Sequence, residues 1–131
     1  MPSMRVAFAG TFAARLEPDV HAYLATPCDV VVADEVAIVS RLADVDVLVT
    51  MAFTAEMAGA AKRLKLVQVP GAGLDRIDRA ALAPETWLAN AYGHETGIAE
   101  YVIGAMLTMT DRKSTRLNSS HSRASRMPSS A

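Results

Sequence analysis

Residues 68–78 read QVPGAGLDRID, a short apolar stretch that runs directly into a glycine-rich loop. Such a pairing is typical of a buried strand and the turn at its carboxyl end. Gly71 and Gly73 allow backbone amides to approach an anionic ligand closely. A dinucleotide-binding G-x-G-x-x-G loop would need glycine at position 76, where Arg76 stands. The loop is therefore a candidate anion site, and a simple tight turn is the alternative.

Four similar apolar segments flank this one and alternate with helical patterns. The alternation predicts βα units around a parallel sheet, which is an α/β fold. The expected strands are residues 5–9, 29–32, 45–49, 66–69 and 87–89. The expected helices are residues 18–24, 35–43, 55–64 and 79–82, followed by one that starts near Glu95 or Thr96. In open sheets of this kind, ligands bind at the carboxyl ends of the strands. The segments expected at those ends are residues 10–11, 50–51, 71–74 and 90–94.

Composition indicates one soluble domain. The chain has 131 residues, 51% of them apolar, and no run reaches the roughly 18 consecutive apolar residues of a membrane span. Cys28 is the only cysteine, so an internal disulfide cannot form, and the N-terminus lacks a secretory signal pattern. We therefore expect a cytoplasmic protein that binds no membrane.

The last 21 residues differ from the rest. Residues 1–110 carry eight Lys/Arg and thirteen Asp/Glu, a net charge of −5, whereas residues 111–131 carry five and one, a net charge of +4. Such a basic, polar segment is typical of disorder and of a nucleic-acid-binding tether. Residues 111–121 and 125–131, however, resemble the translation of a common short-read sequencing adapter. We therefore expect a non-native, disordered tail at 111–131 and no nucleic-acid partner.

Three blocks between residues 64 and 110 resemble the N-terminal part of the D-isomer-specific 2-hydroxyacid dehydrogenases. They are the strand and loop of residues 67–78, then Asn90, then the sequence IAEYV at 98–102 leading into an apolar helix. The resemblance implies that residues 1–110 are an incomplete, flavodoxin-like substrate domain, a parallel sheet flanked by helices. It implies truncation before a Rossmann nucleotide-binding domain that follows in the family.

The implied activity is interconversion of 2-keto acids and D-2-hydroxy acids by hydride transfer with NAD or NADP, in a parent protein that is a homodimer. In that family the loop matching Ala72 and Gly73 offers backbone N–H groups to the substrate carboxylate. An amide that donates to a carboxylate makes a charge-assisted hydrogen bond, which agrees with this role. The full set of expected substrate-binding residues is Ala72, Gly73, Thr50, Met51, Gly93 and His94. An exposed loop histidine is the alternative interpretation of His94.

No residue of this chain matches the arginine, glutamate and histidine that catalyse the reaction in the family, because those lie in or after the nucleotide-binding domain. That domain would also bind most of the cofactor, since Gly10 is the only glycine in the turn directly after the first expected strand. No metal-ligand spacing is visible. We therefore expect the chain alone to be inactive. The alternative is a stand-alone flavodoxin-like module that binds an anion or regulates without catalysis.

Overall fold

The computed structural model describes residues 3–124, with side chains for residues 3–111. The chain divides into two compact units, Met1–Tyr92 and Gly93–Ala131. We expected the boundary after residue 110. That boundary stays a prediction, and one continuous helix runs through position 110. Gly93, the first residue of the second unit, has a φ of +90°, which suits glycine.

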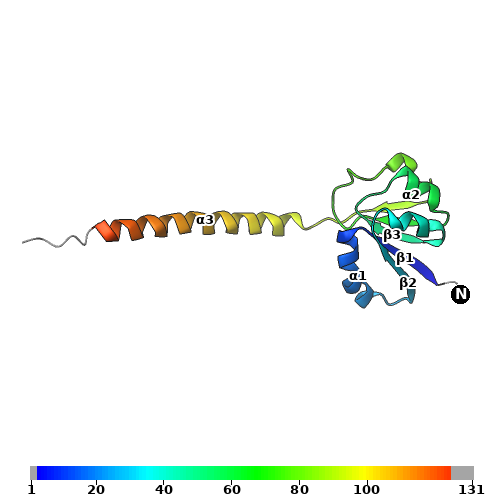
Figure 1. Cartoon of the computed structure of the whole chain (residues 1–131), viewed down its shortest axis with the longest axis horizontal. Helices are drawn as coiled ribbons and strands as arrows, with labels where there is room; N and C mark the ends of the chain where they lie inside the picture. Colours follow the sequence, from blue (N-terminus) through cyan, green and yellow to red (C-terminus); the bar gives the residue numbers. More distant parts are fainter. Residues whose placement is uncertain (1–2, 125–131) are drawn as a thin grey trace, which may run out of the picture. The chain divides into compact units, whose positions relative to one another are not determined.

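The first unit alternates five strands with four short helices (Figure 1). The elements are β1 Met4–Ala9, α1 Thr11–Tyr23, β2 Cys28–Ala33, η1 Ala37–Asp44, β3 Val47–Thr50, α2 Ala55–Ala60, β4 Leu66–Gln68, η2 Arg79–Ala81 and β5 Trp87–Ala89, where η marks a 3₁₀ helix. All strand pairs are parallel, in the order β2-β1-β3-β4-β5. This is the doubly wound order of flavodoxin-like sheets. The predicted fold class is therefore confirmed.

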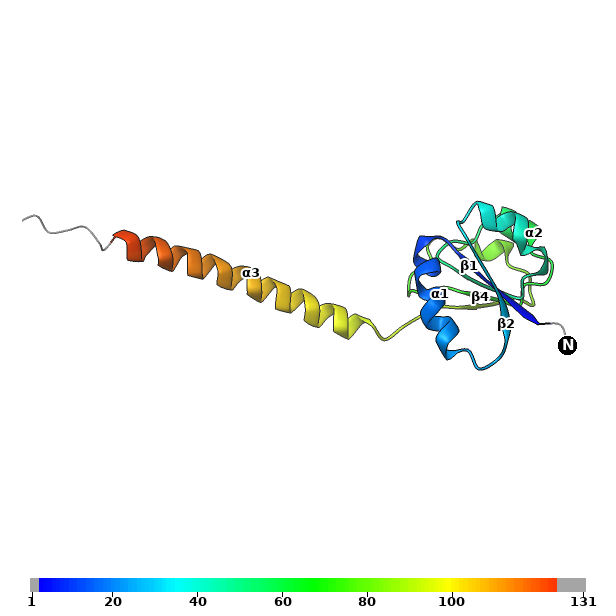
Figure 2. The same cartoon turned by 60° about the horizontal axis from the view of Figure 1, so that its bottom comes forward.

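Apolar side chains fill both faces of the sheet. On one face Leu48 and Val67 are completely buried in a cluster that includes Leu42 of η1 and Met57 of α2. On the other face Phe8 packs with Ala13 of α1. Figure 2 shows α1 and α2 on opposite sides of the strands. The carboxyl ends of the strands are thus held at one edge between two packed layers.

Asp46 fastens the starts of three strands together. Its backbone N–H donates to the Arg5 carbonyl at 2.9 Å, its carbonyl accepts from the Lys65 N–H at 2.8 Å, and its carboxylate accepts from the Arg5 N–H at 3.1 Å. The carboxylate is almost fully buried and lies 3.1 Å from both the Arg63 and the Lys65 side-chain nitrogens. The Arg5 N–H, followed by Lys65 and Arg63, lowers the Asp46 pKa to about 2, against the opposing effect of burial.

Two helix boundaries differ from expectation. We predicted a helix at residues 18–24 with Pro18 in its first turn, but α1 begins at Thr11 and contains Pro18. The helix starts early because Gly10, with φ of +89°, turns the chain directly out of β1. The helix predicted for residues 55–64 ends at Ala60, although its predicted cap is correct, since Thr54 Oγ1 accepts from the Met57 N–H at 3.2 Å.

The second unit contains α3, Glu95–Ala124, which begins where the sequence predicts. It continues across residues 111–124, which we expected to be disordered. No glycine or proline occurs between residues 105 and 124, so nothing in this stretch interrupts the helix. The non-native origin of residues 111–131 stays a prediction. Among the helices described, none is long and apolar enough to cross a membrane.

Candidate functional site

The glycine-rich loop follows β4 and is tied on one side to the end of β5. The Val69 N–H donates to the Ala89 carbonyl at 2.8 Å, which extends the β4–β5 pairing by one step. The Ala91 N–H then donates to the Gly71 carbonyl at 3.0 Å. These contacts at the ends of β4 and β5 hold this side of the loop.

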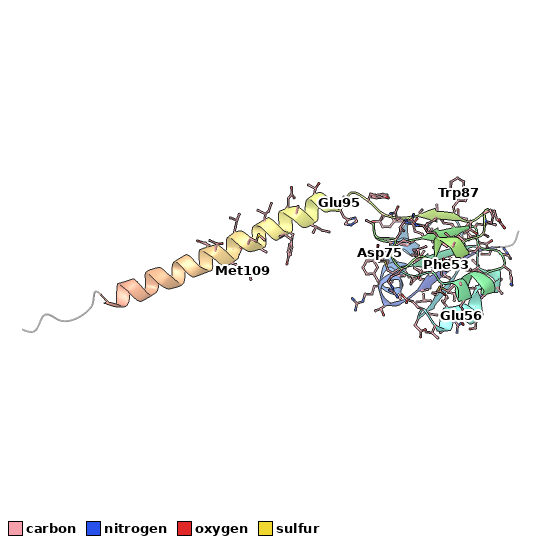
Figure 3. The ribbon with its side chains drawn as sticks, turned by 90° about the horizontal axis from the view of Figure 1, so that it is seen from above. Phe53, Glu56, Asp75, Trp87, Glu95 and Met109 are labelled. Carbon is pink, nitrogen blue, oxygen red and sulfur yellow. The ribbon has the colours of Figure 1, made fainter. Side chains whose placement is uncertain are left out.

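On its other side the loop is tied to the segment that follows β3. The Phe53 N–H donates to the Arg76 carbonyl at 3.0 Å, and the Phe53 carbonyl accepts from the Asp78 N–H at 2.9 Å. Phe53 itself is 2% exposed, so this tie is fixed in the core. Figure 3 labels Phe53 and Asp75 on these neighbouring segments. The loop therefore lies across the carboxyl edge of the sheet, held by β3 and β5.

Ala72 and Gly73 are the centre of this loop. Within the part of the chain that the structure describes, neither backbone N–H donates to any acceptor. Ala72 is half-buried and Gly73 is exposed. Neighbouring backbone N–H groups that converge on one point can bind an anion. Binding of a substrate carboxylate by these two N–H groups stays a prediction.

Thr50 and Met51 end β3 beside the loop, but they differ in what they can contact. The Met51 side chain lies against Gly71, with its Cε 3.4 Å from where a Cβ on that glycine would stand. Thr50 is fully buried, and its hydroxyl donates to the Ala52 carbonyl at 2.8 Å and accepts from the Ala52 N–H at 3.2 Å. The Thr50 hydroxyl therefore shapes the turn, whereas the Met51 side chain lies against the loop. Contact of either residue with a substrate stays a prediction.

Gly93 and His94 belong to the second unit, at the start of α3. The His94 carbonyl accepts from the Ile98 N–H at 3.1 Å, and its side chain is exposed. The Glu95 carboxylate accepts from its own N–H and from the Gly93 N–H at 3.0 Å, and these bonds, with His94 nearby, lower its pKa against a smaller effect of burial. In this geometry both residues organise the first turn of α3. Their contact with a substrate stays a prediction.

Sequence reasoning missed an ion pair at the same edge of the sheet. Arg76 Nη2 lies 2.7 Å from Glu35 Oε2. The two side chains border an open recess of about 370 Å³, together with Gly10, Thr11, Asp34 and Val36. From the sequence, the only conclusion about Arg76 was that it replaces the third glycine of a dinucleotide-binding loop. Because the partners are 41 positions apart, no local pattern indicates their pairing.

The described residues do not fit a dinucleotide cofactor. Such a site needs a glycine-rich turn between the first strand and its helix, and here Gly10 is the only glycine in that turn. The loop after β4 also fails, because Arg76 occupies the third glycine position and is paired with Glu35. No group of three or more possible metal ligands occurs among the described residues. The unpaired polar groups that the structure describes at the centre of the loop include the backbone N–H groups of Ala72 and Gly73.

Comparison with known proteins agrees with the fold. The structure is similar to a 2-hydroxyacid dehydrogenase from Ketogulonicigenium vulgare Y25, with a TM-score of 0.66, 17% identity, and coverage of 99% of this chain and 43% of that one. It is also similar to the PH0520 protein from Pyrococcus horikoshii OT3, with a TM-score of 0.60, 18% identity, and coverage of 88% and 38%. This chain therefore spans less than half the length of either structure. A search of curated proteins gave no match.

A family comparison is more specific. The model of the D-isomer specific 2-hydroxyacid dehydrogenase catalytic domain matches residues 11–123, which is most of the chain. The match includes the loop with the two free amides and the start of α3. The chain therefore belongs to the D-isomer specific 2-hydroxyacid dehydrogenase family and corresponds to its catalytic domain.

Proposed function

We propose that this chain is the substrate-binding part of an NAD(P)-dependent oxidoreductase that interconverts 2-keto acids and D-2-hydroxy acids. The observation that carries the proposal is the pair of free N–H groups on Ala72 and Gly73 at the carboxyl end of β4. Family membership gives the reaction class, and these donors give the chain a defined part in it. That part is to hold the carboxylate of the substrate.

The loop suits a carboxylate for two reasons. Hydrogen bonds from N–H groups to an ionised oxygen are shorter and stronger than neutral ones, so two adjacent donors can fix both position and orientation. The loop residues are also small, since Gly73 has no side chain and Ala72 has only a methyl group. Asp75 Oδ2 lies 3.2 Å from where a Cβ on Gly73 would stand, so a bound carboxylate would have to approach from the side away from Asp75. Met51 adds an apolar wall beside Gly71, suited to the carbon skeleton of a small acid.

The remaining parts of the reaction are assigned to a nucleotide-binding domain outside this chain. That domain would bind NAD or NADP, which supplies the redox chemistry when bound. It would also provide the arginine that clamps the carboxylate and the histidine that acts as acid and base. We propose that this chain alone does not turn over substrate. We also propose that the full-length parent protein, with its nucleotide-binding domain, is a homodimer. Closure of two such domains would exclude water from the reacting groups.

Genomic DNA downstream of codon 110 provides the decisive test. We expect adapter-related codons to be absent there, and a G-x-G-x-x-G loop followed by Arg, Glu and His in that order. The uninterrupted product should oxidise NADH or NADPH with a small 2-keto acid, followed by absorbance at 340 nm. A natural stop codon near codon 110 would instead support a stand-alone anion-binding module. If the nucleotides that encode residues 111–131 are unrelated to the adapter, the tail is native.

A further inference from the structure

We propose that Asn90 is a positioning residue that aims the amides of Ala72 and Gly73 at the substrate. The proposal rests on the function proposed above, because it concerns how the carboxylate donors are oriented. Its basis is a single side-chain contact. Asn90 Nδ2 donates to the Ala72 carbonyl at 2.8 Å, from the position directly after β5.

Peptide geometry connects this contact to the site. A trans peptide is planar, and its C=O and N–H point in opposite directions. The carbonyl of Ala72 and the N–H of Gly73 belong to one such unit. When Asn90 holds the carbonyl towards the end of β5, the Gly73 N–H must point away from β5. The Ala91 N–H does the same for the preceding unit, since it holds the Gly71 carbonyl at 3.0 Å and so orients the Ala72 N–H.

The two peptide groups, Gly71–Ala72 and Ala72–Gly73, differ in the kind of group that binds their carbonyl. The Gly71 carbonyl is bound by a backbone group, which nearly any residue at position 91 would supply. The Ala72 carbonyl is bound by a side chain, so this orientation depends on the residue type at position 90. An asparagine amide is a donor of suitable length there, whereas alanine has no donor and aspartate has only acceptors at neutral pH. The side chain is half-buried, and it makes no other hydrogen bond within the described residues.

The experiment compares Asn90→Ala and Asn90→Asp with a matched control, Gln68→Ala. Gln68 Nε2 also donates to a backbone carbonyl beside the loop, that of Val69 at 3.1 Å. The peptide unit it contacts carries no N–H, because residue 70 is proline. Removing Gln68's amide therefore deletes an equivalent side-chain bond without releasing a carboxylate donor.

The readout is binding of pyruvate to the whole chain labelled with ¹⁵N-glycine, with pyruvamide as the uncharged comparison. The chain contains seven glycines, so the Gly73 signal can be assigned by its loss in Gly73→Ala. We expect pyruvate to shift the Gly73 signal in the unaltered chain and in Gln68→Ala. Asn90→Ala should bind about tenfold more weakly, the effect of losing about one well-oriented hydrogen bond, and Asn90→Asp at least as weakly. Unchanged Gly10 and Gly59 signals would show that the fold is intact.

Each outcome separates the two proposals. If pyruvate does not bind the unaltered chain at Gly73, the proposed carboxylate site is wrong. If it binds there and equally well in Asn90→Ala, the carboxylate site stands and the role of Asn90 is overturned. If the Asn90 variants do not fold, a scalar coupling across the hydrogen bond from the Asn90 side-chain amide to the Ala72 carbonyl in the unaltered chain decides. Its presence, with strengthening when pyruvate is added, supports the proposal, and its absence contradicts it.

Discussion

Asp46 is a buried carboxylate that accepts from the Arg5 N–H of β1 and faces Arg63 and Lys65, which precede β4. We predict that Asp46→Asn lowers the free energy of unfolding by about 1–3 kcal/mol, because the Arg5 N–H keeps an oxygen acceptor while the charge facing Arg63 and Lys65 is lost. Urea unfolding at neutral pH measures the loss. The control is Asp44→Asn, whose carboxylate pairs with Arg5 and is 51% exposed. That change should stay within about 0.5 kcal/mol, and an equal loss in both variants would contradict the prediction.

The same carboxylate predicts a sensitivity to acid. The Asp46 pKa is lowered to about 2 in the folded chain, against roughly 3.9 for an unfolded aspartate. A lowered pKa means that the folded state favours the ionised form, so the stabilisation is complete above about pH 4 and is lost as the pH falls towards 2. Urea unfolding between those values should show a steeper loss for the native sequence than for Asp46→Asn. Parallel curves would show that Asp46 does not titrate in this window.

Gly10 makes a backbone turn that other residues adopt poorly. Its φ of +89° and ψ of +162° lie in a region occupied almost only by glycine. A Cβ there would also stand 3.1 Å from Glu35 Oε1. We predict that Gly10→Ala destabilises the fold by about 1–3 kcal/mol, measured by thermal unfolding. Gly59→Ala is the matched control, since nothing lies within 4 Å of its Cβ position. It should be neutral or stabilising by up to about 1 kcal/mol.

The short helix α2 depends on its N-terminal cap. With only six residues, it has few internal hydrogen bonds, and Thr54 Oγ1 satisfies the Met57 N–H at 3.2 Å. We predict that Thr54→Ala costs about 0.5–2 kcal/mol. The control is Thr26→Ala, because Thr26 is exposed and its hydroxyl makes no hydrogen bond to the described residues. Chemical unfolding of both variants makes the comparison, and an unchanged stability of Thr54→Ala would show that the cap is dispensable.

How far the sequence predicted each element depends on how local its determinants are. Each strand is a short apolar run bounded by turn residues, so all five were placed within two residues of their observed limits. The start of α1 was missed because Pro18 is equally typical of a first helical turn, and only the geometry of Gly10 decides between the two. Inside the site, family resemblance pointed to the loop of Ala72 and Gly73, and its role towards a carboxylate stays a prediction. The side-chain contact from Asn90 spans 18 positions, and no periodicity reports it.

The second unit has a surface whose composition suggests association. Seven large apolar side chains of α3 between residues 98 and 109 are 42–78% exposed: Ile98, Tyr101, Val102, Ile103, Met106, Leu107 and Met109. Apolar stripes of this length on soluble chains usually mark contact surfaces or cause aggregation. We therefore expect α3 to determine whether the chain self-associates in solution.

We predict that the chain self-associates through this stripe. Light scattering coupled to gel filtration should give a mass that rises with concentration, because association removes apolar surface from water. Ile98→Gln together with Met106→Gln should reduce the association, since both side chains are more than half exposed and their loss costs the helix little. Val36→Gln is the control, as Val36 is 84% exposed but lies in the first unit, so its mass profile should match that of the unaltered chain. A monomer at all concentrations with a sharp cooperative melt would contradict the prediction, and equal association of the double variant would place the contact elsewhere than α3.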